Sequence, residues 1–415
     1  ASDVTAFLEH AREVTYLEDD DVAYLTDDAI EVYHDGDIVD RGIQTVDWEA
    51  EAAEKGGYEH YMLKEIHEQP RSLRQTISGR IDELNGEADL EIDLPVEYLN
   101  SLEEIQFVAA GTSYHAGLYA KHLLQDLADI RVTVEVASEY AFAGGRDPWR
   151  TLVVGISQSG ETADTLEAVR QAARAGAKTL AVTNTVGSTI TREVDDSVFI
   201  RAGPEIGVAA TKTFVTQVVT LLLLAIYLGR ARGTLSAESA SDILADLRGL
   251  PGGVQQILDD EAAVRAVAEA YGDGEAFFFI GRRLGGPVAL EGALKLKEIS
   301  YDHAEGFPAG ELKHGPLALV TEETPVLAVL TEGSRASETL NNVKEVESRG
   351  APVVGLTSIP EAEKFLDASF EVPELGLLEP LAANVYFQLF AYYVALQKGR
   401  PIDKPRNLAK SVTVK

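Results

Sequence analysis

The sequence contains no cysteine and a single methionine among its 415 residues. Without cysteine, this chain has no disulfides, no thiolate metal ligands and no cysteine nucleophile. Basic residues are scarce as well, because 36 Lys and Arg stand against 68 Asp and Glu and leave a formal net charge of −32. A nucleic-acid backbone requires a basic surface, so we expect no nucleic-acid partner.

Long uninterrupted hydrophobic runs are also missing. Residues 218–228 are apolar except for Thr220 and Tyr227, a stretch shorter than the about 20 residues that cross a bilayer. Polar residues interrupt the second apolar stretch, 377–396. Both are predicted to be buried helices of a soluble, cytoplasmic protein, with neither a membrane partner nor a signal peptide. The chain begins Ala-Ser-Asp without an initiator methionine, so we expect a fragment or a processed product.

The excess of carboxylates is spread over the whole chain, in patches such as residues 18–21 and 259–261. Salt at 1 M shortens the Debye length to about 3 Å and screens such charges. The composition therefore predicts a salt-adapted, halophilic protein rather than an ordinary acidic one. Because the overall field repels anions, an anionic substrate needs a local binding device.

The chain divides into regions of different pattern. With 45% hydrophobic and 25% charged residues it has a globular composition, and its length favours two or three domains. The N-terminal region predicts a small β meander with strands at 14–17, 22–25 and 30–33. Helix formers then predict a helical connector, with helices at 48–57 and 58–84.

From about residue 100 onward, short apolar strands alternate with helical stretches. The strand candidates are residues 105–110, 132–136, 152–156, 179–182 and 198–200. Helical patterns at 116–128 and 161–175 separate several of them. Such alternation is typical of an α/β fold, in which helices cover both faces of a parallel sheet.

The alternating pattern recurs in the second half of the chain. Three glycines at equivalent places have counterparts 170, 173 and 174 residues later. The pairs are Gly111 and Gly281, Gly160 and Gly333, and Gly176 and Gly350. Nearly constant offsets predict two copies of one α/β unit, at about 100–235 and 265–400.

A hydroxyl-rich turn follows one strand of the first copy. The strand at 152–156 runs into the sequence SQSGET at 157–162, and a helical pattern follows. The turn therefore lies at a helix N-terminus, where free backbone N–H groups and the helix dipole favour an anion. Its three hydroxyls add donors, so we interpret it as a phosphate site, with simple N-capping as the alternative. Thr112 and Ser113 follow the preceding strand and are predicted to face the same crevice.

The second copy carries a charged cluster. Residues 287–300 predict a helix with proline in its first turn, and Glu291, Lys295 and Glu298 share one face of it. A solvated ion pair is the alternative interpretation. His303 and His314 follow closely, so we interpret the region as an acid/base site. Metal binding is a weaker alternative, since the two histidines are eleven residues apart and no cysteine is present.

The C-terminal segment 403–415 is basic on an acidic protein. A frayed end is the usual interpretation of such a segment. Its local charge is opposite to that of the whole chain, and we therefore predict a tail that docks on the active site.

Several motifs together resemble one enzyme family. They are GTSY at 111–114, SQSGET at 157–162, EIGVA at 205–209, the run 291–300, ELKHGP at 311–316 and the tail 406–414. The combination is similar to the glutamine:fructose-6-phosphate aminotransferase (isomerizing), or glucosamine-6-phosphate synthase, family. The resemblance covers about residues 60–415, and residues 1–40 resemble the last strands of the family's N-terminal glutaminase domain.

The resemblance implies an α/β fold with two tandem sugar-isomerase (SIS) domains, each a parallel sheet sandwiched by helices, preceded by a short β meander and a helical linker. The implied regions are the end of the glutaminase domain (1–45), the linker (46–95), the SIS domains (96–240 and 241–400) and an active-site tail (401–415).

The resemblance also implies the reaction: fructose 6-phosphate and ammonia would give glucosamine 6-phosphate, the first step of the hexosamine pathway, in a homodimer without cofactor or metal. The substrate would be bound by Thr112, Ser113, Ser157, Gln158, Ser159 and Thr162, and by backbone groups of Val208 and Ala409. His314 from the neighbouring subunit would open the sugar ring, and Lys410 would form a Schiff base with the open-chain ketone. Glu298 would move the proton between C1 and C2, assisted by Lys295.

Two departures from the family pattern are visible. The family's glutaminase works through an N-terminal cysteine, which this chain lacks, so ammonia would come from the glutaminase domain of a full-length enzyme or from solution. Ala210 stands where many relatives carry serine, which removes one hydroxyl from the sugar site. The alternatives are a SIS sensor of sugar phosphates and a SIS deglycase without aminotransfer. A sensor has no need for Glu298, His314 and Lys410 together.

Overall fold

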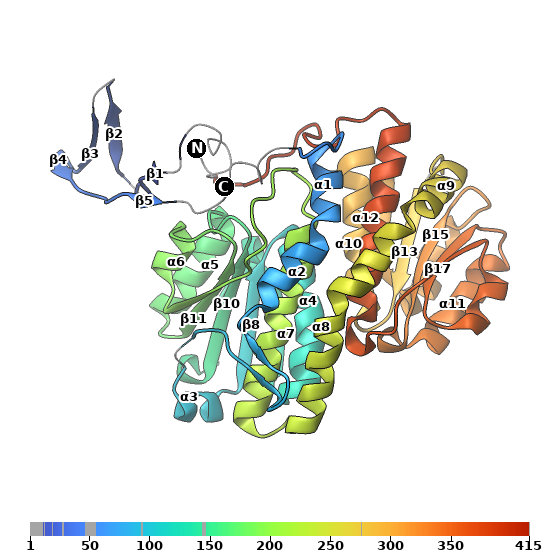
Figure 1. Cartoon of the computed structure of the whole chain (residues 1–415), viewed down its shortest axis with the longest axis horizontal. Coiled ribbons are helices and arrows are strands. Elements are labelled where there is room, and N and C mark those ends of the chain that lie inside the picture. The colour runs from blue at the N-terminus through green and yellow to red at the C-terminus, as the bar shows by residue number, and fades with distance from the viewer. Residues whose placement is uncertain are drawn as a thin grey trace.

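The computed structural model describes the chain at residues 11, 13–18, 20–26, 29–45, 55–92, 94–142, 147–274 and 276–414. Figure 1 shows two α/β halves side by side, with long helices filling the space between them. A small group of strands projects from the first half, and the C-terminal segment returns from the second half towards the first.

The first half contains a five-stranded parallel sheet with the strand order β12-β11-β10-β8-β9. Its strands are β8 (Glu104–Ala109), β9 (Arg131–Val136), β10 (Thr151–Ser157), β11 (Lys178–Thr183) and β12 (Asp196–Phe199). Every residue of β8 and β10 is buried. The predicted strands agree with these bounds to within two residues, because a strand buried on both faces reads as a continuous hydrophobic run.

The second half repeats this sheet, with the strand order β14-β13-β15-β16-β17. Its strands are β13 (Ala276–Gly281), β14 (His303–Pro308), β15 (Val326–Leu330), β16 (Val353–Thr357) and β17 (Ala368–Glu371). Numbered from the first strand of each copy, both sheets have the order 2-1-3-4-5. The predicted repeat and the α/β class are therefore confirmed.

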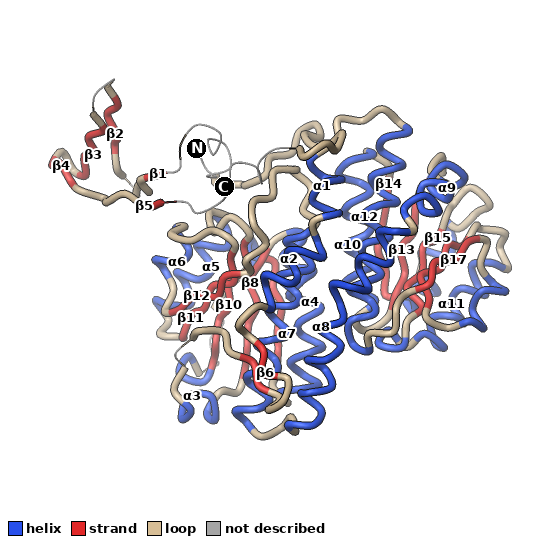
Figure 2. The backbone as a smooth tube through the Cα atoms, viewed as in Figure 1, coloured by secondary structure: helices blue, strands red, loops and turns tan. Residues whose placement is uncertain are grey.

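Helices cover both faces of each sheet (Figure 2). Those of the first half are α4 (Gly111–Ala128), α5 (Ala163–Arg174), α6 (Thr189–Glu193) and α7 (Lys212–Arg232). Those of the second are α10 (Gly285–Ser300), α11 (Ala336–Glu347) and α12 (Glu379–Gln397), and α8 (Ala237–Asp259) and α9 (Glu261–Tyr271) connect the halves. Helix α4 packs against α7, α10 packs against α12, and α4 meets α10 where the halves join.

The two long apolar segments are core helices, as predicted. By length and composition α7 is suited to cross a membrane, but 83% of its apolar window is buried inside the structure. Helix α12 is buried along nearly all of its length. Both helices contribute to one hydrophobic cluster that includes residues of both halves, so the two copies share a core.

The connector contains less helix than predicted. Helices α1 (Tyr61–His67) and α2 (Gln69–Ile77) are present, but the helix expected at 58–84 ends with α2. The expected helix at 48–57 lies largely outside the described residues. A short helix, α3 (Val96–Ser101), precedes the first sheet.

A hairpin replaces the end of the expected helix. It pairs β6 (Ile81–Asp82) with β7 (Glu87–Ala88) in antiparallel register. Gly79 and Gly86 adopt φ values of +73° and +64°, a conformation that interrupts a helix at little cost only for glycine. Asp82 also accepts hydrogen bonds from the backbone and side chain of Asn85, which closes the turn.

The N-terminal strands form the predicted meander. It consists of β2 (Val22–Leu25), β3 (Ile30–His34) and β4 (Asp37–Val39) in an antiparallel sheet. The strand expected at 14–17 is shorter than predicted: β1 (Glu13–Val14) pairs with β5 (Gln44–Thr45).

Candidate active site

The hydroxyl turn, residues 157–162, connects the end of β10 to the start of α5. The hydroxyl oxygens of Ser157 and Thr162 lie 2.9 Å apart, and Ser157 Oγ accepts a hydrogen bond from the Gly160 N–H at 3.0 Å. Ser159 Oγ accepts one from the Glu161 N–H at 3.2 Å. Ser157 and Ser159 are buried. The turn therefore presents fixed hydroxyls and a helix N-terminus to any anion bound there.

Two neighbours maintain the shape of the hydroxyl turn. Gly160 has a φ of +70°, and a Cβ at this position would collide with the side chain of Ser188. The Glu161 carboxylate accepts hydrogen bonds from the Thr189 N–H at 2.7 Å and the Thr189 hydroxyl at 2.8 Å. Glu161 thereby stabilises the N-terminus of α6, so its negative charge is already engaged.

The hydroxyl turn lies at the topological switch point of the first sheet. β8 and β10 are neighbours, and the chain continues from β8 to one edge and from β10 to the other. Ligands of open α/β sheets bind at this point, outside the carboxyl ends of the strands. Thr112 and Ser113 lie in the first turn of α4, directly after β8. The Gln158 Nε2 group is buried and has no hydrogen-bond partner among the described residues, so a donor is available to a ligand.

The charged residues of α10 form what we term the carboxylate–lysine row: Glu291, Lys295 and Glu298. The Lys295 ammonium lies 3.3 Å from Glu291 Oε1 and 2.6 Å from Glu298 Oε2. Lys295 and Glu291 are completely buried, whereas 20% of the Glu298 side chain is exposed. The interpretation as a solvated ion pair is therefore wrong, because α4, α12 and the second sheet pack around α10 and exclude water.

The row has a fixed pattern of charge. Burial alone would lower the pKa of Lys295, but the carboxylates of Glu291 and Glu298 outweigh burial and raise it. Lys295 therefore stays an ammonium ion. Glu298 is the row's most exposed member, and a carboxylate held in this way is a suitable general base.

Helix α4 connects the row to the first half of the molecule. Thr112 Oγ1 donates to Glu291 Oε1 at 3.0 Å and accepts from Lys295 Nζ at 3.1 Å. His115 Nδ1 lies 2.8 Å from Glu291 Oε2. The hydroxyl of Thr112, predicted to bind substrate, thus bonds to the row. Sequence reasoning placed Glu291 in the charged cluster but missed its partner His115; the spacing of Thr112 and His115 by three on one helix face was the available signal.

Ser113 is also engaged within the protein, since its Oγ accepts a hydrogen bond from Gln217 Nε2 at 3.0 Å. Ser113 therefore lies in the first turn of α4, held by a side chain from α7, and its contact with a substrate stays a prediction.

The tail, residues 401–414, docks on the first half, so the interpretation as a frayed end is wrong. The Ala163 N–H, the first of α5, donates to the Val412 carbonyl at 3.1 Å. The tail therefore lies beside the hydroxyl turn. Lys410 Nζ lies 2.5 Å from Glu205 Oε2 and donates to the Gly207 carbonyl at 2.8 Å.

The partner of Lys410 is a completely buried carboxylate. Burial alone would raise the pKa of Glu205, but the Lys410 charge and the N–H groups of Thr211 and Thr213 outweigh burial and hold it below its usual value. The Lys410 amine thus donates to Glu205 and to the Gly207 carbonyl, and a nitrogen engaged in this way acts as a nucleophile only after a proton passes to a neighbour.

The remaining predicted site residues do not join this cluster. His314 ends a short 3₁₀ helix, Ala309–His314, and is exposed; the described part of the chain gives it no hydrogen bond or ion pair. His303 is 65% exposed and approaches only Glu305. Ala409 is exposed, while the Val208 N–H donates to the Asp403 carbonyl at 3.1 Å and so joins the tail to the first half.

The second copy has a different turn at the place of the hydroxyl turn. It is a short 3₁₀ helix, Glu332–Ser334, which follows β15. Glu379 Oε2 accepts hydrogen bonds from the Glu332 N–H at 3.0 Å and from Ser358 Oγ at 2.8 Å. Glu379 is 3% exposed, and burial raises its pKa.

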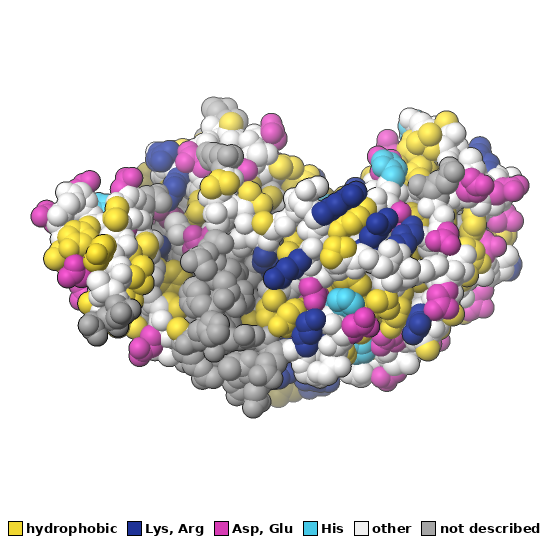
Figure 3. Space-filling view, turned by 90° about the horizontal axis from the view of Figure 1, so that it is seen from above, with side chains coloured by type: hydrophobic (Ala, Val, Ile, Leu, Met, Phe, Trp, Pro, Cys, Tyr) yellow, Lys and Arg dark blue, Asp and Glu magenta, His cyan; other side chains and the backbone are white. Residues whose placement is uncertain are grey.

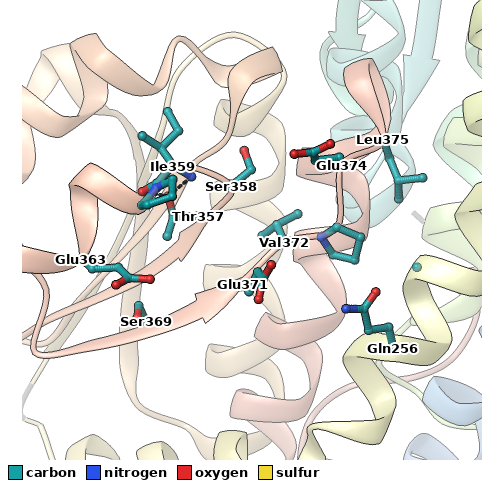
Figure 4. Close-up of a pocket in the computed structure, with 13 residues that line it drawn as sticks. Gln256, Thr357, Ser358, Ile359, Glu363, Ser369, Glu371, Val372, Glu374 and Leu375 are labelled. Atoms are coloured by element: carbon teal, nitrogen blue, oxygen red, sulfur yellow. Dashed lines mark hydrogen bonds between the residues drawn. The ribbon is translucent and has the colours of Figure 1, made fainter.

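A separate pocket of about 520 Å³ opens near the carboxyl ends of β16 and β17 (Figure 4). Glu363, Glu371 and Glu374 contribute to its lining. Such a lining repels a sugar phosphate. Seen from above, Lys and Arg side chains instead gather near the middle of the upper face (Figure 3).

Comparison with known proteins gives one domain family and one enzyme name. The SIS domain family model matches residues 98–227 and 274–396. Glutamine–fructose-6-phosphate aminotransferase (isomerizing) from Halobacterium salinarum is 62% identical over 414 residues, 100% of this chain and 69% of the relative. The protein of that name from Thermus thermophilus is 47% identical over 421 residues, with the same coverage. The first relative fits the halophilic interpretation of the acidic composition.

A solved structure has the same architecture. The C-terminal domain of glucosamine-fructose-6-phosphate aminotransferase from Francisella tularensis aligns with a TM-score of 0.79 at 37% identity. The alignment covers 85% of this chain and 100% of that one.

Proposed function

This chain belongs to the glutamine–fructose-6-phosphate aminotransferase (isomerizing) family and contains its SIS domains, and we propose that it performs the synthase half of that reaction. The substrate is fructose 6-phosphate, the nitrogen donor is ammonia, and the product is glucosamine 6-phosphate. The 415 residues contain no cysteine, so hydrolysis of glutamine by a cysteine nucleophile is not available to this chain.

The observation that carries this proposal is the connection between the switch point of the first sheet, beside the hydroxyl turn, and the carboxylate–lysine row. Thr112 begins α4 at the switch point and bonds to both Glu291 and Lys295 of α10. A phosphate in the hydroxyl turn therefore holds a six-carbon sugar with its other end towards Glu298 and the tail. Fixing a substrate in this way replaces a bimolecular encounter by an intramolecular one.

The proposed steps use groups already described. Ser157, Gln158, Ser159 and Thr162 bind the phosphate and hydroxyls, with Ser113 and the backbone of Val208 and Ala409 at the sugar. After ring opening, Lys410 gives a proton to the Glu205 carboxylate, 2.5 Å away, and its nitrogen attacks the C2 carbonyl. The carbonyl oxygen leaves as water and a Schiff base remains. Ammonia then adds at C2 and displaces the Lys410 amine, which places the nitrogen on the sugar and frees the lysine. Glu298 moves a proton from C1 to C2 of the resulting imine, with Lys295 fixing the orientation of Glu298.

Ring opening is assigned to His314 of a neighbouring subunit in a homodimer. The exposure of His314 and its lack of partners within the described chain support this assignment, since a side chain that acts in another subunit must be accessible. We also propose a cytoplasmic location. Ammonia would come from the glutaminase domain of a full-length enzyme.

The proposed division of the chain follows from the same family. Residues 1–45 are the end of a glutaminase domain, 46–95 a linker, 96–240 and 241–400 the SIS domains, and 401–415 the active-site tail. A sensor that only binds sugar phosphates has no use for a buried Glu291–Lys295 pair beside Glu298, so we favour the enzyme.

The test is an assay of the purified chain with three sets of substrates. Fructose 6-phosphate alone should yield glucose 6-phosphate, because proton transfer by Glu298 needs no nitrogen donor. Addition of ammonium should yield glucosamine 6-phosphate, while glutamine should yield no glutamate. Binding of fructose 6-phosphate without formation of either product, at any salt concentration that keeps the chain folded, would instead support the sensor.

A further inference from the structure

The tail is anchored to helix α1 as well as to the first sheet. The two Asp403 carboxylate oxygens accept hydrogen bonds from the Tyr61 and Met62 N–H groups, each at 3.0 Å. The Asp403 carbonyl accepts from the Val208 N–H. One tail residue thus joins α1 to the loop 205–208, which contains the partners of Lys410.

Helix α1 holds the same loop from the other side through Glu65. Glu65 Oε1 accepts hydrogen bonds from the Ile206 N–H at 2.5 Å and the Gly207 N–H at 3.1 Å. A Cβ on Gly207 would lie 2.9 Å from Glu65 Oε2, so any larger residue here would require the Glu65 carboxylate to shift. The Gly207 carbonyl accepts from Lys410. A single residue therefore separates the Glu65 carboxylate from the Lys410 amine.

The charges around Glu65 show that its contact with the loop 205–208 is not a simple ion pair. Glu65 is 2% exposed, and its Oε2 has no hydrogen-bond partner among the described residues. The groups that face it are Glu205 from the loop, Lys410 from the tail and Lys212 from α7. Lys212 is already paired with Glu68 at 2.6 Å. Glu65 thus acts mainly as an acceptor for loop N–H groups, in a place where a carboxylate is costly to bury.

We propose that Glu65 and Asp403 are positioning residues for Lys410: through them, α1 fixes the loop 205–208 and the tail so that the amine has one location in the crevice. The inference rests on the proposed role of Lys410 as the Schiff-base nucleophile. It adds that this nucleophile is held by the connector helix, which is outside both sheets, and not by its Glu205 partner alone.

The experiment compares two readouts on Lys410 in four variants of the full chain. Glu65→Ala removes the acceptor, Glu65→Gln keeps an acceptor oxygen, and Asp403→Ala releases the tail anchor. Glu59→Ala, an exposed residue just before α1, is the matched control. The first readout is the mass adduct formed on Lys410 by borohydride with fructose 6-phosphate. The second is the rate of Lys410 acetylation by an N-hydroxysuccinimide ester without sugar, relative to exposed Lys364.

We expect Glu65→Ala and Asp403→Ala to reduce the adduct at least tenfold and to raise the relative acetylation rate several-fold. Glu65→Gln should keep most of the wild-type adduct and an acetylation rate near that of the wild type. Glu59→Ala should match the wild type in both readouts. Calorimetry should show that Glu65→Ala and Asp403→Ala bind fructose 6-phosphate with nearly the wild-type affinity. A general loss of structure would not preserve that affinity. If Glu65→Ala does not fold, Asp403→Ala and Glu65→Gln still decide the matter.

The outcomes separate this inference from the proposed function. One outcome overturns the positioning role and leaves the proposed function intact. In it the wild type forms the adduct, and Glu65→Ala and Asp403→Ala form as much adduct and are acetylated at the same relative rate as the wild type. Absence of adduct in the wild type overturns the assignment of Lys410 as nucleophile. In that case the acetylation rates alone still show whether α1 fixes the amine.

Discussion

The Lys295 ammonium and the Glu298 carboxylate lie 2.6 Å apart, with the lysine completely buried and the glutamate one-fifth exposed. Because the lysine is also paired with buried Glu291, its position is fixed from within the core. The partly exposed Glu298 carboxylate is therefore held by a lysine whose own position is fixed. If Glu298 is the base that we propose, this geometry separates the residue that reacts from the residues that hold it.

Replacing Glu298 by glutamine should remove the base and keep the side-chain shape. Isomerisation of fructose 6-phosphate without a nitrogen donor should fall by roughly 10²- to 10⁴-fold, while calorimetry shows unchanged binding of the sugar phosphate. Glu305→Gln, at a side chain 42% exposed, is the control and should retain full activity. A wild-type rate in Glu298→Gln would show that another group moves the proton.

Removing two hydroxyls from the turn should weaken substrate binding. The Ser157→Ala, Thr162→Ala double variant loses the hydroxyl pair at 2.9 Å, at a cost on the order of 1–3 kcal/mol per lost partner of a charged group. Titration calorimetry with fructose 6-phosphate measures the change, with exposed Ser348→Ala as the control. Equal affinity in the double variant would place the phosphate elsewhere.

Gly160→Ala should destabilise the chain more than Gly176→Ala. Both glycines have positive φ values, of +70° and +88°, but only at Gly160 would a Cβ meet neighbouring atoms. Backbone strain, about 1–2 kcal/mol, is common to both variants, so the difference in melting temperature reports the collision with Ser188. Similar melting temperatures for the two variants would mean that the hydroxyl turn adapts.

The stability of the chain should depend on pH through Glu65. Burial, followed by the nearby charge of Glu205, raises the pKa of Glu65 above its ordinary value. The folded chain then holds the Glu65 proton more tightly than the unfolded chain. This contribution is fully present below the unfolded pKa and is lost as the pH rises through the folded pKa.

Glu65→Gln cannot titrate, so its melting temperature should rise relative to the wild type between pH 5.5 and pH 8, at constant molar salt. The exposed Glu361→Gln variant should follow the wild type over this range. A constant difference between Glu65→Gln and the wild type would mean that Glu65 has the same pKa in both states.

The sheets could be predicted because their signal is local. β8, β10 and β11 are short apolar runs, and their length together with the turn residues that bound them indicates buried strands. The hairpin of β6 and β7 was missed because the segment is rich in helix formers. Its conformation depends instead on Gly79 and Gly86 and on the Asp82–Asn85 hydrogen bonds.

The site could be predicted only where it is continuous in sequence. The hydroxyl turn is six consecutive residues between a strand and a helix, so its position followed from the pattern. The partners of Glu291 and Lys410 did not, because His115 is 176 residues from Glu291 and Glu205 is 205 residues from Lys410. Such pairs are brought together by the packing of α4 on α10 and by the return of the tail.

The buried Glu379 side chain makes the two copies of the α/β unit unequal in the number of sugar phosphates that they bind: we expect one in the first copy and none in the second. In the second copy this side chain already accepts the backbone N–H of Glu332 and the Ser358 hydroxyl, so these donors are already engaged within the protein. A free phosphate would have to displace the Glu379 side chain from these donors. The isotherm for fructose 6-phosphate should therefore reach saturation at one equivalent per chain, although the fold was built twice.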